Sequence, residues 1–238
     1  MILPNPKDAL HRSRMYQLLA EIADNQYLAT NMVFKGGTCA ALINKLDRFS
    51  VDLDFDLKTE SDNLKISNQL EKIFADLSLK IDGRSSKAVQ YVLKYEAPIS
   101  LRNTLKLDAI YRESTEDEYV PVFLPDLDRY LVCQTIETMF AHKLVAITDR
   151  YNKHKTVAGR DIYDIHYFFI NNYQFSKKIV QARTGKTAEE YLKYLVEFVK
   201  QNVDQDLLNE DLNTLLSPEQ FQQIRKTLKQ EILNMLKF

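Results

Sequence analysis

The pattern of apolar and polar positions changes character about halfway along the chain. In the first half, short apolar runs and alternating segments, which are typical of strands, lie between stretches of helical periodicity. From Leu131 onward, apolar positions recur three or four residues apart almost to the end. This change predicts an α+β fold in which a mixed sheet with flanking helices is followed by an all-helical C-terminal domain. We place the boundary near Pro125, which gives domains at 1–125 and 126–238 with a cleft between them.

The same periodicity gives the individual elements. Helices are predicted at Asn5 to Ala23, Cys39 to Leu46, Ser61 to Leu77, Glu137 to Tyr151, Gly159 to Ile170, Ala188 to Gln201 and Pro218 to Leu236. Strands are predicted at Met32 to Lys35, Val51 to Leu57, Ser78 to Asp82, Lys87 to Tyr95, Thr104 to Tyr111 and Tyr119 to Leu124. Pro121 and Pro125 place the last strand at the sheet edge, or leaving it, because proline cannot donate to a strand ladder. Ser61 is the expected cap of its helix.

The strand from Val51 to Leu57 is apolar on one face and acidic on the other. Because side chains alternate along a strand, Asp52, Asp54 and Asp56 point one way and the apolar residues the other. Aspartate is depleted in strands, so three on one face indicate a bound ligand such as a divalent cation. Asp52 and Asp54 lie about 6.6 Å apart along the strand, close enough to reach one or two Mg²⁺ ions. The alternative is a solvated face balanced by neighbouring basic side chains.

A Gly36-Gly37-Thr38 turn precedes the acidic strand. Glycines let backbone N–H groups approach a ligand closely, and the start of a following helix favours anions such as phosphate. Taken alone, such a turn is most often structural. Beside a pair of carboxylates it indicates nucleotide chemistry, because Mg²⁺ completes its coordination shell with substrate phosphates. Asp108, on the strand Thr104 to Tyr111, is either a third metal ligand or simply an exposed carboxylate.

Two cations and two carboxylates in the helical half are further candidates. Lys143 and Arg150 lie two turns apart on one face of their predicted helix. If that face meets the cleft, Lys143 can bind a triphosphate and offset the charge of a leaving pyrophosphate. The alternative is a lysine whose stem packs on the core. Asp161 and Asp164, one turn apart on the next helix, can position these cations, or Asp161 can be no more than a favourable charge at a helix start.

Composition sets bounds on the partners and on the compartment. The 238 residues are 45% hydrophobic and carry a formal net charge of -1, so the chain can bury a core, and any nucleic acid must be met by a local basic surface. Between Tyr151 and Lys200 there are nine Lys or Arg against five Asp or Glu, an excess of +4 that suits an RNA backbone or a solvated face. The two cysteines lack metal-ligand spacing, and no signal peptide or membrane span is evident, which favours a cytoplasmic protein without a membrane partner.

These residues carry a resemblance to a known family. Lys35-Gly36-Gly37-Thr38, followed by Arg48-Phe-Ser50-Val-Asp52-Leu-Asp54, resembles the signature of nucleotidyltransferase toxins of the AbiEii/AbiGii type, within the polymerase-β-like nucleotidyltransferase superfamily. The later acid Asp108, the pair Lys143 and Arg150, and the motif Arg160-Asp161-Ile-Tyr-Asp164 match further parts of the family pattern. The resemblance covers roughly Val33 to Phe169 and implies a nucleotidyltransferase-type mixed sheet.

The resemblance also implies roles for these residues. The metal ligands for Mg²⁺ or Mn²⁺ are expected to be Asp52, Asp54 and Asp108. The nucleoside triphosphate is expected to contact Gly36, Gly37, Thr38, Arg48, Ser50, Lys143 and Arg150, although a serine closing a tight turn is equally often structural. The catalytic set is Asp52, Asp54, Lys143 and Asp161, with Asp161 a base on the incoming hydroxyl or a partner of the cations. Asp56 has no counterpart in the signature and is left out.

The function expected from this reading is transfer of a nucleoside monophosphate from an NTP to an acceptor hydroxyl. The resemblance implies a toxin of a toxin–antitoxin or abortive-infection system, a cognate antitoxin, and an RNA acceptor such as tRNA, with a protein acceptor also open. Two rival readings remain: a metal-dependent nuclease, since acidic clusters with two metals also hydrolyse phosphodiesters, and a non-catalytic nucleotide-binding or antitoxin-like module. The base of the NTP is not encoded by any of these motifs.

Overall fold

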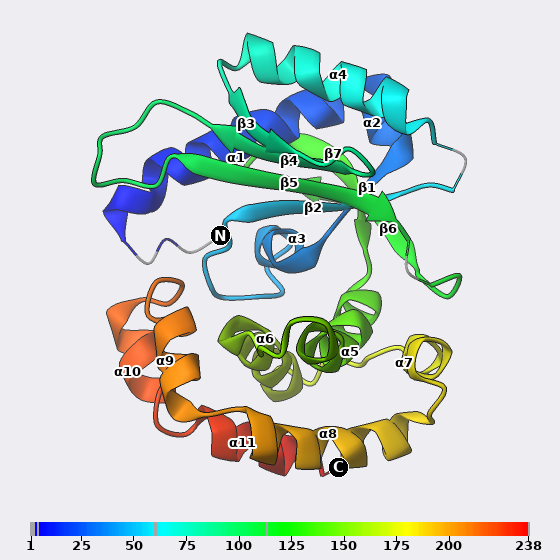
Figure 1. The fold of residues 1–238 in the computed structure, drawn as a ribbon, viewed down its shortest axis with the longest axis vertical. Coiled ribbons are helices and arrows are strands. Elements are labelled where there is room, and N and C mark those ends of the chain that lie inside the picture. The colour runs from blue at the N-terminus through cyan, green and yellow to red at the C-terminus, as the bar shows by residue number, and fades with distance from the viewer. Residues whose placement is uncertain (1–2, 4, 60, 113, 238) are drawn as a thin grey trace.

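A seven-stranded mixed sheet forms the centre of the first half of the protein (Figure 1). The computed structural model describes residues 3, 5–59, 61–112 and 114–237. Within them the strand order is β3-β4-β5-β2-β1-β7-β6. The strands are β1 (Met32–Lys35), β2 (Asp52–Leu57), β3 (Lys80–Arg84), β4 (Val89–Lys94), β5 (Thr104–Tyr111), β6 (Tyr119–Leu124) and β7 (Arg129–Gln134).

Strand pairing places the two carboxylate-bearing strands side by side. β2 pairs with β1 in the antiparallel sense and with β5 in the parallel sense. β1 also pairs with β7 in parallel, and the outer pairs β3–β4, β4–β5 and β6–β7 are antiparallel. The predicted α+β fold with a mixed sheet is confirmed, and β6 lies at the sheet edge as its prolines indicated.

Helices cover both faces of the sheet. On one face lie the short 3-10 helix η1 (Pro6–Asp8) and helices α1 (Ala9–Asp24), α2 (Gln26–Asn31) and α4 (Asn63–Asp76). On the other face lies α3 (Gly36–Leu42), between the sheet and the helical half (Figure 1). The six residues of α3 that follow Gly36 are all buried, because its small side chains let it pack closely on β1 and β2.

The second half is helical and packs below α3. Its helices are α5 (Ile136–His154), α6 (Gly159–Ile170), α7 (Lys177–Thr184), α8 (Ala188–Asn202), α9 (Gln205–Leu212), α10 (Pro218–Ile224) and α11 (Leu228–Met235). α5 contacts α3, α6 and α7, so it is one of the helices that connect the sheet side to the rest. No helix in the described ranges is long and apolar enough to cross a membrane.

The clearest difference from the sequence reading is β7. Its residues were assigned to the beginning of the helical half, but they form a strand between β1 and β6. Leu131 and Cys133 are buried and Val132 is half-buried, a period of two that is too short to stand out before a long helix. The expected boundary at Pro125 therefore falls in the turn between β6 and β7, and helices take over at Ile136. The division into two domains stays a prediction.

Other differences concern short elements and element ends. Helices α2, α7 and α9 were not expected, because six to eight residues hold too few periods to be recognised. The predicted helix Pro218 to Leu236 is two helices, and the helix expected from Cys39 begins at Gly36. The cap of α4 is Asp62, whose side chain accepts from two backbone N–H groups, and not Ser61.

Candidate active site

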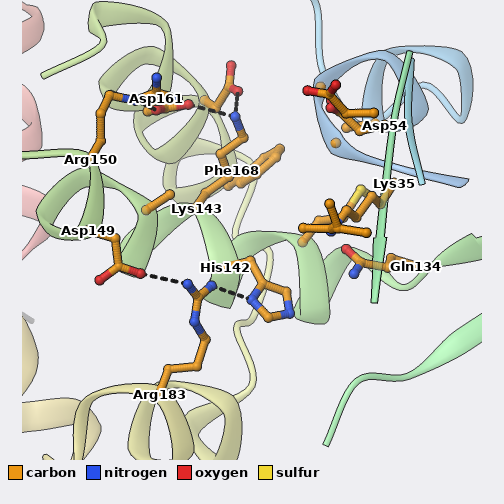
Figure 2. Close-up of a pocket in the computed structure, with 18 of the residues that line it drawn as sticks. Lys35, Asp54, Gln134, His142, Lys143, Asp149, Arg150, Asp161, Phe168 and Arg183 are labelled. Atoms are coloured by element: carbon orange, nitrogen blue, oxygen red, sulfur yellow. Dashed lines mark hydrogen bonds and ion pairs between the residues drawn. The ribbon is translucent and has the colours of Figure 1, made fainter. Parts of the chain in front are cut away.

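A cleft of about 540 Å³ lies between the sheet and helices α5, α6 and α7 (Figure 2). Many of the residues singled out from the sequence line it: Gly36, Gly37, Asp54, Asp108, Lys143, Arg150 and Asp161. The sheet side contributes the glycines and carboxylates, and the helical side contributes the cations and Asp161. The structure thus brings together residues that are up to 125 positions apart in the sequence, from Gly36 to Asp161.

The floor of the cleft is a row of polar side chains that crosses five strands. Gln90 is the Cα partner of Asp108, Asp108 of Asp54, and Asp54 of Lys35. The parallel pairing of Phe34 with Cys133 places Lys35 beside Gln134 at the end of the row. Directly opposed residues share one face of a sheet. All five side chains line the cleft, so the acidic pair Asp54 and Asp108 lies in the middle of the row.

The two carboxylates of this row, Asp54 and Asp108, and the neighbouring Asp52 repel one another. Burial, together with the charges of Asp52 and Asp108, raises the pKa of Asp54 from 3.8 to about 6. Burial and the charge of Asp52 also raise the pKa of Asp108. In the described part of the chain, no hydrogen bond or ion pair is formed by the side chains of these three aspartates. No cation among the described residues therefore lies within ion-pair distance of them, although the charges of Lys143 and Lys35 partly offset the rise in the pKa of Asp54.

The aspartates of the cleft fit a divalent cation whose coordination shell is completed by the substrate. Among the residues described, no group of three or more His, Cys, Asp or Glu side chains converges closely enough to hold an ion by itself. Mg²⁺ usually takes only one or two protein carboxylates and fills its shell with water and phosphate oxygens. A cation would also relieve the repulsion that raises the pKa of Asp54. Asp54 and Asp108, which line the cleft, fit this pattern together with a phosphorylated ligand, whereas Asp52, also predicted as a ligand, does not line the cleft.

The glycine turn is shaped by the side chains beneath it. Gly36 has φ +79°, and a Cβ at this position would lie 2.4 Å from Oδ2 of Asp54. A Cβ on Gly37 would lie 2.7 Å from Nη2 of Arg48 and 3.1 Å from Oγ of Ser50. Both positions require glycine, because any side chain would overlap with a group that the site needs. The backbone of the turn is thereby left open towards the cleft.

Replacing Gly36 by alanine should reduce the activity expected from the sequence by at least about tenfold, because the methyl group displaces the Asp54 carboxylate. Gly185 is a matched control, since it also has a positive φ, +69°, but nothing lies within 4 Å of an added Cβ. Gly185→Ala should cost about 1 kcal/mol of stability from backbone strain and leave the activity unchanged. Activity assays with thermal unfolding of both variants check this. Wild-type activity in Gly36→Ala would contradict the placement of Asp54.

Three predicted nucleotide-binding residues lie beneath the turn and do not line the cleft. Thr38 is fully buried and its hydroxyl donates to the backbone carbonyl of Asp52. Arg48 is 2% exposed, and its guanidinium donates to Asp164 at 2.5 and 2.8 Å and to the carbonyl of Phe49. Ser50 is 8% exposed. This geometry does not support direct nucleotide contacts by Thr38 or Arg48, because their donors already serve the fold. They support the turn from behind.

Lys143 is held by both aspartates of the Arg-Asp-x-x-Asp motif. Its Nζ lies 2.7 Å from Oδ1 of Asp161 and 3.0 Å from Oδ2 of Asp164. The Nε of Arg150 lies 3.5 Å from the other oxygen of Asp161. Burial would raise the pKa of Asp161, but the charges of Lys143 and Arg150 outweigh it and the pKa is lowered. A carboxylate with a lowered pKa is a weak base, so this geometry favours positioning of Lys143 over proton abstraction.

The sequence reading missed several side chains of the cleft. Lys35 lies in the floor of the cleft and pairs with Asp56, and both positions were already marked by the motif and by strand alternation. On the helical side, Arg183 of α7 donates to Nδ1 of His142 at 2.7 Å and to Asp149 at 2.6 Å (Figure 2). No signal in the sequence pointed to these, because α7 itself was not recognised.

The site combines glycines at the start of a helix, carboxylates on two neighbouring parallel strands and a lysine that faces them from a helical unit. This is the arrangement expected of a nucleotidyltransferase. The sequence profile described as "Nucleotidyl transferase AbiEii toxin, Type IV TA system" matches residues 17–234. The chain therefore belongs to the AbiEii family of nucleotidyltransferase toxins, from type IV toxin–antitoxin systems. This confirms the family and the enzyme class that the motifs indicated.

Solved structures share the fold over nearly the whole chain. JHP933 from Helicobacter pylori is 22% identical, with a TM-score of 0.60 over 99% of this chain and 92% of that one. MenT4, a nucleotidyltransferase toxin from Mycobacterium tuberculosis, is 15% identical, with a TM-score of 0.59 over 98% of this chain and 85% of that one. At these identities the likeness establishes the fold alone. No curated protein sequence matches this chain.

Proposed function

We propose that the protein transfers a nucleoside monophosphate from an NTP to a hydroxyl group of an RNA acceptor such as tRNA, with Mg²⁺ or Mn²⁺ as the metal. The observation that supports this most directly is the arrangement of the cleft. Asp54 and Asp108, uncompensated and partly buried, face Lys143 across a space of about 540 Å³ beside an open glycine turn. A triphosphate with its metal would supply both charges: the metal cation meets the aspartates of the sheet wall, and the phosphates meet Lys143 on the helical wall.

In this proposal each group has a defined task. Asp52, Asp54 and Asp108 would hold the metal, which when bound activates the attacking oxygen and stabilises the leaving one. Gly36 and Gly37 let the phosphates approach the backbone closely. Lys143, held by Asp161 and Asp164, binds the β- and γ-phosphates and neutralises charge on the leaving group.

The bond changes balance without a further reactant. The acceptor oxygen attacks the α-phosphorus, so one P–O bond forms as the bond from the α-phosphorus to the bridging oxygen breaks. Pyrophosphate leaves with that oxygen and its electron pair, and the proton of the acceptor hydroxyl passes to water. Asp161 remains ionised and bound to Lys143 throughout, as its lowered pKa favours.

An RNA acceptor is supported by the charge at the mouth of the cleft. Arg150, Lys153, His154 and Arg183 line its helical side, and all of them except Arg150 lie within the segment that carries the excess of +4. Cations on the rim of an active site attract a phosphate backbone and position it for reaction. The family also implies an antitoxin partner. Growth arrest on expression, relieved by co-expression of the neighbouring open reading frame, would support the toxin role.

The decisive experiment incubates purified protein with each labelled NTP, Mg²⁺ and total RNA. Label on RNA supports transfer, and shortened RNA supports a nuclease. The absence of both label and shortening supports a module without turnover. Lys143→Met should lower transfer about 100-fold or more, because a cation for the leaving group is lost. Lys72→Met, at an exposed lysine on α4, is the matched control and should retain full activity. Equal labelling by Lys143→Met and wild type would refute the assignment of Lys143.

A further inference from the structure

Asp56 is the third carboxylate on the acidic face of β2, and it differs from the other two. It is only 1% exposed, whereas Asp52 and Asp54 are half-buried. One oxygen lies 2.6 Å from Nζ of Lys35. The other accepts from Nε2 of Gln134 at 2.6 Å and from the Tyr119 hydroxyl at 3.2 Å. A buried carboxylate with three partners is not accessible to a ligand. Asp56 therefore acts on the site through the side chains that it holds in place.

Among these three partners of Asp56, only Lys35 carries a charge, and its side chain lines the candidate active site. It lies next to Asp54 in the polar row and lines the cleft, with 15% of its side chain exposed. An ammonium group has three N–H donors. In the described residues Asp56 is its one ion-pair partner, whereas Lys143 has two. Donors of Lys35 therefore remain for a ligand in the cleft.

The two lysines approach the site from opposite walls. Figure 2 shows Lys35 and Asp54 on the sheet wall, and Lys143 with Asp161 on the helical wall. Both ammonium charges act on Asp54, opposing the rise in its pKa that burial and the neighbouring aspartates cause. A phosphate chain that crosses the cleft would thus meet a fixed cation at each end. The end beside Asp54 and Asp108 is the one where the metal would bind the reacting phosphate.

We propose that Lys35 is a further nucleotide-contacting residue, which binds the α-phosphate from the sheet side while Lys143 binds the pyrophosphate portion. Asp56 is its positioning residue, assisted by Gln134. This assignment rests on the proposed function, because the ligand is the nucleoside triphosphate of the transfer reaction. It explains why β2 buries a third aspartate that the metal does not need.

The test compares binding of the NTP found in the labelling assay, with Mg²⁺, by calorimetry. Lys35→Met should weaken binding at least about tenfold, and Lys35→Arg should recover part of the loss. Because Lys35→Met leaves the Asp56 charge buried without its cation, the double variant Lys35→Met/Asp56→Asn separates folding from binding and should show the same loss. Lys58→Met, at an exposed lysine just after β2, is the matched control and should bind as wild type does.

Inorganic pyrophosphate is a second probe that tells the two lysines apart. Lys143→Met should weaken pyrophosphate binding and Lys35→Met should not, because Lys35 is assigned to the α-phosphate. NTP affinity equal to wild type in Lys35→Met and in the double variant would overturn this assignment and leave Lys35 as an internal ion pair, with the proposed function intact. A wild-type protein that binds no NTP would overturn both.

Discussion

Replacing Asp54 by asparagine should abolish at least about 99.9% of the transfer rate and, at the same time, stabilise the metal-free protein at neutral pH. The rate falls because a carboxylate of the proposed metal site becomes a neutral amide of the same shape. Stability rises because the pKa of Asp54 is raised to about 6 by burial and by Asp52 and Asp108, so ionising this carboxyl in the folded protein costs free energy.

The stabilising effect has a defined pH window. A carboxyl whose folded pKa lies above its unfolded value favours folding below the unfolded pKa, and that advantage is lost as pH rises through the folded pKa. For Asp54 the window runs from its ordinary pKa of 3.8 to about 6. Asparagine does not titrate, so the gain of Asp54→Asn over wild type should grow through this window to about 3 kcal/mol.

Urea unfolding of metal-free protein at several pH values measures this gain. Asp82→Asn, at an exposed aspartate on the edge strand β3, is the control and should show no such rise, because Asp82 pairs with Lys94 in solvent. If Asp54→Asn were less stable than wild type above about pH 6, the uncompensated charge inferred for the cleft floor would be wrong.

Removing Arg48 should cost about 3–5 kcal/mol of the free energy of unfolding, the largest stability effect expected outside the apolar core. Its guanidinium and the carboxylate of Asp164 form two hydrogen bonds, and both side chains are at least 98% buried. Arg48→Met leaves the charge of Asp164 in the interior with Lys143 as its one remaining ion-pair partner in the described residues. The charge of Asp164 that is left stays buried and out of contact with water, which is why the loss is large.

The chain offers a matched control on its surface. Arg129 donates to Asp24 through the same two nitrogens, at 2.6 and 3.0 Å, but these side chains are 40% and 49% exposed. Arg129→Met should therefore cost no more than about 1 kcal/mol. Chemical unfolding measures the free energy of unfolding of both variants. Equal losses in Arg48→Met and Arg129→Met would show that burial of the Arg48 pair does not increase its contribution to stability.

The sequence predicted the parts of the site that local patterns encode. Strand alternation put Asp52 and Asp54 on one face, and helical spacing put Lys143 and Arg150 on another. Local patterns do not encode the pairing of β2 with β5, because it joins distant parts of the chain. Asp108 was nevertheless singled out, because the family pattern has a third acid on a strand after the first two. The fold class followed from the change in periodicity, since that depends on many residues at once.

The remaining parts depend on burial and on partners that no spacing encodes. Arg48 and Ser50 fit a binding motif equally well whether they point into the cleft or behind the turn, and only packing decides. Lys35 and Asp56 were both visible in the sequence, but their pairing depends on the register between β1 and β2. The Arg183 contacts depend on α7, a helix too short to be recognised.

The loop between α3 and β2 binds the two halves of the protein to each other. Asp47 accepts from Tyr163 and Gln220, Arg48 pairs with Asp164, and the N–H of Phe49 donates to the carbonyl of Leu215. Because these three consecutive residues contact three separate parts of the helical half, the walls of the cleft cannot swing apart without uncovering a buried charge. The width of the cleft is therefore tied to the buried Arg48–Asp164 pair, and widening it at this loop would cost the free energy of breaking that pair.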